Sequence, residues 1–139
     1  MARRMWKGRF SLYVQLVSAP TLLLAVLLMV HPVLLLGLAF EGADVYNPEQ
    51  ATAIHLFARI AGLAVFVLMI QVLGARQHPG NNRGLFFWVA LLFLAFSGLI
   101  AVEAFLGQAN YWMAAPLLIW VPGAAFFLAF ASRNVLVRE

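Results

Sequence analysis

Long apolar segments alternate with short polar connections along the chain, and this pattern predicts its elements. The apolar segments are residues 11–30 with a continuation to residue 40, residues 51–73, residues 85–106 and residues 114–131. A helix that crosses a bilayer needs ~20 apolar residues, within a range of about 17–25. The sequence therefore predicts an all-α fold, in which a bundle of four transmembrane helices forms a single membrane domain over residues 1–139.

The first segment is longer than one span requires. As a single helix, residues 10–40 would extend about 46 Å at ~1.5 Å per residue, whereas the hydrocarbon core is ~30 Å thick. Pro32 lacks an amide donor and disfavours helical geometry at His31. We therefore expect the helix to break near His31, with the following "VLLLGLAF" along the interface or against other helices. The alternative is an unbroken helix with a steep tilt.

Basic residues lie on one side of this expected topology. They occur before the first segment, between the second and third, and after the fourth, whereas the connections "EGADVYNPEQ" and "GQANYW" contain none. The residues are Arg3, Arg4, Lys7, Arg9, Arg76, Arg83, Arg133 and Arg138. Because basic connections stay in the cytoplasm, both termini are predicted to be cytoplasmic and the chain to cross the membrane several times.

The composition supports lipid as the surrounding solvent. Apolar residues make up 65% of the chain and charged residues 10%, whereas soluble domains have roughly 45–50% and about 25%. The net charge of +4 comes from residues near the segment ends, a pattern that orients a membrane protein and does not indicate nucleic-acid binding. The absence of cysteine excludes disulfides, thiolate metal sites and cysteine nucleophiles.

Two charged residues fall inside apolar segments. Arg59 lies in the second segment and Glu103 near the end of the third. Since side chains lean toward the N-terminus of their helix, Arg59 and Glu103 should lean toward each other if these segments are antiparallel neighbours. We predict an intramembrane ion pair that locks two helices together. A substrate or ion site built on Arg59, Glu103 and His55 is the alternative, as is separate snorkelling to the headgroups.

Two histidines are candidate cofactor ligands. His55 is one turn from Arg59, and His31 falls at the expected end of the first span. With Glu103 they offer metal-binding atoms, and two facing histidines hold a haem iron in some membrane proteins. The A-x-x-x-H spacing from Ala51 to His55 is also seen before chlorophyll-ligating histidines. A single histidine near a helix end is more often an interfacial hydrogen-bonding residue, so no metal or cofactor is firmly predicted.

Small residues mark possible helix contacts, because they let helix backbones approach closely in lipid. The pairs are Ala58 with Gly62, Ser97 with Ala101, and Ala125 with Ala129. Trp120 lies deep in the fourth segment, away from the interfaces where tryptophan gathers, and we expect it to face a neighbouring helix.

The chain resembles small bacterial four-helix membrane proteins of the DoxX-like kind over about residues 50–110. The likeness is carried by "ARIAGLAVFVLMI", an early arginine followed by an apolar run with glycine, and by the short basic loop "ARQHPGNNRG". It implies a multi-pass protein of the bacterial inner membrane, with four spans, cytoplasmic termini and an association with redox-linked membrane complexes. Many members of that group carry an arginine in the third span, where this chain has Glu103.

No catalytic motif such as a nucleophile elbow, P-loop or H-E-x-x-H occurs. The leading hypothesis is a small non-catalytic membrane subunit or accessory protein that packs with other membrane protein subunits. One alternative is a redox or pigment-binding protein that holds haem or a chlorophyll-type pigment through His55 or His31. Another is a small transporter-like bundle that binds an anionic ligand at Arg59.

Overall fold

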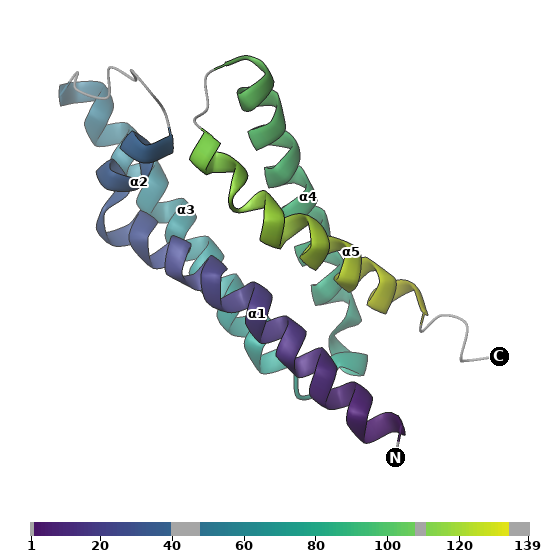
Figure 1. Cartoon of the computed structure of the whole chain (residues 1–139). Coiled ribbons are helices and arrows are strands. Elements are labelled where there is room, and N and C mark those ends of the chain that lie inside the picture. The colour runs from purple at the N-terminus through teal and green to yellow at the C-terminus, as the bar shows by residue number, and fades with distance from the viewer. Residues whose placement is uncertain (1, 40–47, 108–110, 134–139) are drawn as a thin grey trace.

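The computed structural model describes residues 2–39, 48–107 and 111–133, with side chains for residues 8–35, 52–107 and 113–132. Figure 1 shows the arrangement of its elements. They are α1 (Ala2–Val30), α2 (Pro32–Ala39), α3 (Pro48–Ala75), the 3-10 helix η1 (Pro79–Asn82), α4 (Arg83–Phe105), the 3-10 helix η2 (Tyr111–Ala114) and α5 (Leu117–Arg133). The predicted all-α class is confirmed for these residues, which contain no strand.

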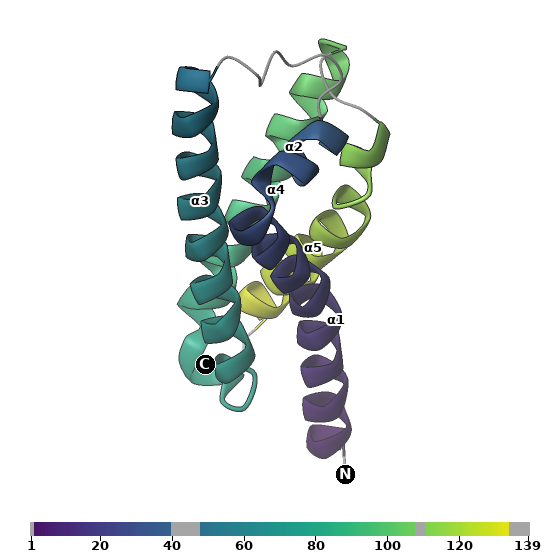
Figure 2. The ribbon, with the colours of Figure 1, turned by 90° about the vertical axis from the view of Figure 1, so that its left-hand side faces the viewer.

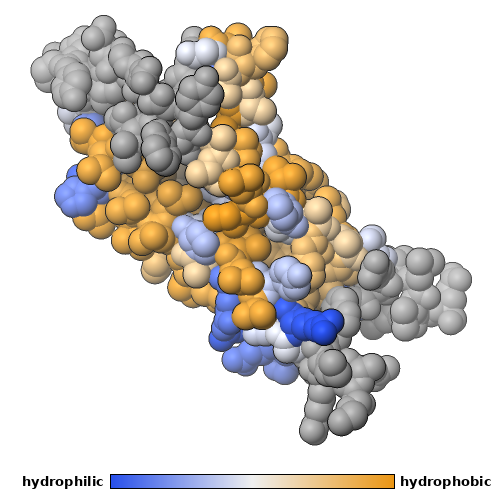
Figure 3. All heavy atoms as spheres, in the orientation of Figure 1, coloured by the Kyte–Doolittle hydropathy of each residue, from blue (hydrophilic) through white to orange (hydrophobic). Residues whose placement is uncertain are grey.

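Among the residues that the structure describes, three helices are long and apolar enough to cross a membrane, over Gly8–Val30, Thr52–Ala75 and Pro79–Phe105. A shorter apolar helix covers Leu117–Ser132. At ~1.5 Å per residue, α5 extends about 25 Å, somewhat less than a ~30 Å hydrocarbon core. On the face shown in Figure 3, hydrophobic atoms cover the middle of the molecule and hydrophilic residues gather near the start of α1. These helices indicate a membrane protein.

The predicted break at His31 is confirmed, because α1 ends at Val30 and α2 begins at Pro32. The His31 amide still donates to the Leu27 carbonyl at 2.8 Å. Pro32 has no amide hydrogen with which to continue this ladder, and Figure 2 shows α2 turning away from the axis of α1. The alternative of one straight, tilted helix through residue 40 is wrong.

The long helices associate as two pairs, α1 with α3 and α4 with α5. The expectation that the second and third apolar segments pack side by side is therefore wrong. Direct contact between α3 and α4 is slight over the described residues, and both helices contact the connecting η1. α3 and α4 are connected by a short loop, yet each of them packs against a different helix.

Gly62 explains the close contact between α1 and α3. A Cβ atom on Gly62 would lie 2.8 Å from the Ala25 carbonyl oxygen and 2.9 Å from the Met29 Cγ atom. Glycine is therefore required if the backbones are to keep this spacing. Of the predicted small-residue contacts, Gly62 and Ser97 are buried, whereas the described side chains of Ala101, Ala125 and Ala129 are exposed.

The two pairs meet through an aromatic cluster that we call the closed end. It joins the first half of α1, the last turns of α3, the first half of α4 and the last turns of α5. Its largest members are Phe10, Phe86, Phe93, Phe127, Phe130 and Met69, all buried. The rings of Phe10 and Phe130 lie 4.4 Å apart, and those of Phe86 and Phe127 lie 5.3 Å apart. These large rings fill the space between the pairs at this end.

Candidate functional site

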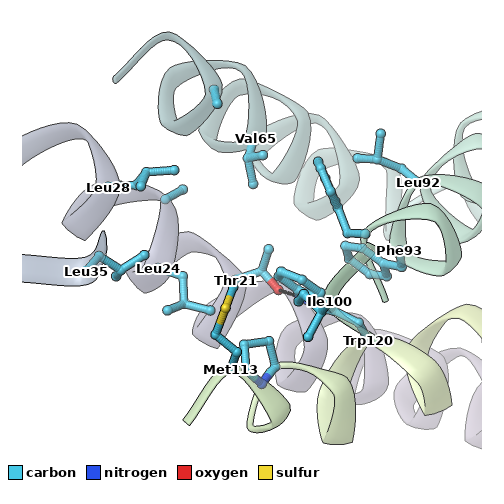
Figure 4. Close-up of a pocket in the computed structure, with 14 residues that line it drawn as sticks. Thr21, Leu24, Leu28, Leu35, Val65, Leu92, Phe93, Ile100, Met113 and Trp120 are labelled. Carbon is cyan, nitrogen blue, oxygen red and sulfur yellow. Dashed lines mark hydrogen bonds between the residues drawn. The ribbon is translucent and has the colours of Figure 1, made fainter. Parts of the chain in front are cut away.

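Beyond the closed end, the two helix pairs leave a half-open cavity of about 330 Å³, which Figure 4 shows. Ala25, Leu28 and Val65 belong to one wall, and Phe96 and Ile100 to the other. We call this region the cavity end. Pockets that bind small molecules have volumes of ~300–1,000 Å³, so the cavity is large enough for a small ligand.

Trp120 and Thr21 connect the two helix pairs next to the cavity. The Trp120 Nε1–H donates to the Thr21 Oγ1 atom at 3.1 Å, and that hydroxyl donates to the Val17 carbonyl at 2.8 Å. Trp120 also stacks on Phe93, with ring centroids 5.9 Å apart and planes 11° from parallel. The expectation that Trp120 faces a neighbouring helix is confirmed. Because Thr21 and Trp120 satisfy each other, the lining presents an apolar surface.

Two short elements lie across the other end of the cavity. Leu35 of α2 and Met113 of η2 both line it, and α2 contacts η2. The break at His31 therefore has a consequence beyond shortening α1. It turns α2 toward the second helix pair, so that the ends of both pairs enclose the same space.

Arg59 lies on α3, seven residues after Thr52, where the membrane-length segment begins. This corresponds to about 10 Å at ~1.5 Å per residue. The Arg59 side chain is exposed, and its guanidinium has no hydrogen bond or ion pair in the described part of the chain. An arginine inside an apolar span thus has no partner among the side chains that the structure describes.

Glu103 lies on α4 and is partly buried. Both Glu103 and Arg59 are among the residues with described side chains, yet the structure forms no ion pair between them. The physical reason is the pairing of the helices, because α3 packs on α1 while α4 packs on α5. Glu103 instead lies one turn beyond Ile100, the last residue of α4 that lines the cavity.

The two candidate ligand histidines have different surroundings. His31 is exposed at the break between α1 and α2. His55 is partly buried, and its Nε2 atom is shielded and has no hydrogen-bond partner among the described residues. Within the residues that the structure describes, no three histidine, aspartate or glutamate side chains gather in a metal-binding group. The set of His31, His55 and Glu103 is therefore not brought together, and haem or pigment ligation remains a prediction.

Comparisons with protein families, curated proteins and solved structures return no match.

Sequence reasoning missed the cavity. The sequence feature that indicates the cavity is a difference in side-chain size. Phenylalanines lie toward one end of the bundle, and small residues such as Ala25 and Ala61 lie toward the other. This difference becomes informative only after the helices are paired, because the pairing decides which positions face the same space.

Proposed function

We propose that the protein is a small, non-catalytic membrane subunit or accessory protein that binds another membrane protein through α3. The observation that carries this proposal is Arg59, exposed within an apolar span and unpaired in the described part of the chain. The proposal commits to a partner of stated chemistry, a transmembrane helix that presents a carboxylate at the depth of Arg59.

Arg59 carries its charge within an apolar span. An ionised side chain at the centre of a bilayer costs at least ~2.5 kcal/mol, a value that already includes relief by snorkelling toward the headgroups. A carboxylate on a partner helix would form a charge-assisted, bidentate hydrogen bond with the guanidinium. Binding a partner would therefore stabilise a residue that the described part of the chain leaves unpaired.

The surface of α3 supports the same proposal. In its most apolar window, 17% is buried inside the molecule, against 28% for both α1 and α4. Exposed apolar residues recur on it at spacings of three and four, which places them on one face of the helix. They are Leu56, Ile60, Leu63, Val67 and Ile70. This stripe beside Arg59 is a suitable surface for one partner helix.

The proposed topology has α5 as a fourth span and both termini in the cytoplasm of a bacterium. Figures 1 and 2 both place the start of α1, the α3–α4 connection and the end of α5 at the same end of the molecule. Arg9, Arg76 and Arg83 lie in these parts of the chain, as the positive-inside rule requires of a cytoplasmic side. The resemblance to DoxX-like proteins supports the same topology.

Site-specific photo-cross-linking in native membranes tests the partner contact. We expect a photoreactive residue at Leu63, beside Arg59, to form one adduct with another membrane protein. The same residue at Leu99, which is 62% exposed on α4, is the control and should not form this adduct. Arg59→Gln should reduce the Leu63 adduct several-fold, Arg59→Lys should retain it, and Arg9→Gln should leave it unchanged.

Two outcomes of this experiment contradict the proposal. An adduct that contains only a second copy of this chain would identify self-association. An adduct that survives Arg59→Gln would show that the charge has no role in the contact. If Arg59 binds a soluble anionic ligand instead, added ligand and not a partner protein should protect Arg59 from modification.

A second candidate function has one observation in its favour, the shielded and unpartnered Nε2 of His55. This atom is a suitable ligand for a haem iron or a chlorophyll-type magnesium. The purified protein should then show a visible absorption band that His55→Leu removes and His78→Leu retains. A spectrum without such a band contradicts this candidate.

A further inference from the structure

The cavity between the helix pairs is apolar, unlike the charged sites at Arg59 and Glu103. Its polar lining residues, Thr21 and Trp120, already satisfy each other, and the rest of the lining is hydrocarbon or thioether. A buried water needs two to four polar partners. The cavity therefore favours an apolar occupant over water.

The position of the cavity determines where an occupant would come from. Its walls belong to the membrane-length segments of α1, α3 and α4 and to the apolar α5. Ala61 lines the cavity and is also exposed on α3. Hydrocarbon from the surrounding bilayer therefore reaches the cavity without passing through water.

The volume defines the size of the occupant. A cavity of about 330 Å³ lies near the lower limit of the ~300–1,000 Å³ of small-molecule pockets, so it accommodates part of a hydrocarbon chain. The closed end, where Phe93 is buried, stops a chain from extending further. The occupant is thus a single hydrocarbon chain of medium length, or the last part of a longer one.

Glu103 adds a headgroup preference. It lies three residues after Ile100, which lines the cavity, and residues at this spacing share a helix face. Side chains lean toward the N-terminus of their helix, so the Glu103 carboxylate leans back toward Ile100. Glu103 is partly buried and has no hydrogen bond or ion pair in the described part of the chain. Glu103 itself does not line the cavity, but a carboxylate one helical turn beyond the lining attracts the ammonium headgroup of an amphiphile whose chain lies inside.

We propose that the cavity between the two helix pairs binds a membrane amphiphile, with its hydrocarbon chain among the cavity walls and its ammonium headgroup at Glu103. This site is separate from the exposed stripe on α3. It gives the protein a ligand of its own, independent of whether a partner protein binds at Arg59.

Tryptophan fluorescence tests the chain site, because bromine on a hydrocarbon chain quenches tryptophan by contact. A protein with Trp120 as its single tryptophan is made by changing Trp6, Trp88 and Trp112 to phenylalanine. In nanodiscs of a neutral glycolipid, whose headgroup carries no ammonium, brominated decylamine should quench Trp120 in a saturable manner, and unbrominated decylamine should reverse the effect. The control is a variant in which Trp88, 68% exposed, is the single tryptophan. Its quenching should not saturate, because it comes from brominated amphiphile in the bulk lipid.

Matched substitutions on α3 then locate the site. Ala61→Phe places a ring in the cavity and should abolish the saturable quenching of Trp120. Ala64→Phe makes the same change at an exposed position that does not line the cavity, and it should leave the quenching unchanged. If Trp120 responds as Trp88 does, or if Ala61→Phe and Ala64→Phe behave alike, no chain binds in the cavity and the proposal is overturned.

The headgroup preference is tested with brominated decanol and decanoate. Decylamine should bind about tenfold more tightly than decanol, which corresponds to ~1.4 kcal/mol, and decanoate should bind most weakly. Glu103→Gln should remove the advantage of decylamine and leave the affinity for decanol unchanged. Equal affinities for the amine and the alcohol in the wild-type protein would overturn the assignment of Glu103, as would an unchanged preference in Glu103→Gln.

Discussion

The closed end and the cavity end use the same four long helices but fill the space between the pairs differently. At the closed end, α1 contributes Phe10 and α5 contributes Phe127 and Phe130, all buried. At the cavity end, α1 contributes Ala25 and α3 contributes Ala61 and Val65, and a cavity of about 330 Å³ remains. The size of the side chains, and not the path of the helices alone, determines whether the two pairs are joined.

The contact within a pair does not loosen at the cavity end. Gly62 brings α3 against the backbone of Ala25 and Met29 on α1, next to positions that line the cavity. Small residues therefore have two opposite effects in the same region. On the face between α1 and α3 they bring two backbones together, and on the face toward α4 they leave space.

The largest expected effect is the loss of aromatic packing at the closed end. Phe86 is fully buried, and its ring contacts the rings of Phe10 and Phe127. Phe86→Ala should lower the free energy of unfolding by about 3 kcal/mol, near the lower limit for such truncations in soluble proteins. The loss is at the lower limit because moving an apolar side chain from lipid into the protein core gains little free energy, so that mainly packing is lost. Unfolding in mixed detergent micelles measures this change.

Phe87→Ala is the control for this substitution, since Phe87 is 40% exposed. It should cost much less than Phe86→Ala. Equal losses for the two variants would show that the closed end is not the main contact between the pairs.

A smaller effect is expected from crowding the contact within the first pair. Gly62→Ala places a Cβ atom 2.8 Å from the Ala25 carbonyl oxygen and should cost about 2 kcal/mol, as overpacking does in other cores. Gly74→Ala is the control on the same helix, because a Cβ atom there has nothing within 4 Å. A melting temperature for Gly62→Ala at or above that of Gly74→Ala would mean that α1 and α3 are not in close contact.

Enlarging a valine distinguishes the two ends directly. Val72 at the closed end and Val65 at the cavity are seven residues apart on one face of α3. Val72→Leu should cost about 1–2 kcal/mol because no space remains around it, whereas Val65→Leu extends into the cavity and should be neutral or slightly stabilising. Chemical unfolding of both variants provides the comparison, and equal losses would argue against an open cavity.

The smallest expected effect concerns the hydrogen bond that joins the pairs beside the cavity. A double-mutant cycle with Trp120→Phe and Thr21→Val should give a coupling of about 0.6 kcal/mol, the average for such bonds between membrane helices. The cycle is needed because Thr21 also bonds to Val17 on its own helix. A coupling within error of zero would indicate that the aromatic stack with Phe93 holds Trp120 in place by itself.

The sequence by itself determined the elements of this protein. Apolar length predicted the membrane-length helices, and Pro32 predicted the end of α1 at Val30. These features are local, because a span is set by the number of apolar residues and a break by a missing amide donor. Sequence position also identified Trp120 as a residue that faces a neighbouring helix.

Only the tertiary structure decided which helices pair and where space remains. The sequence led us to pair Arg59 with Glu103 because consecutive segments were expected to be neighbours, whereas α3 packs on α1 through Gly62 and α4 packs on α5. In lipid the apolar surfaces of helices are nearly interchangeable, so hydropathy does not rank one neighbour over another. Steric fit makes that choice, and it depends on side chains from several helices at once, which no single segment contains.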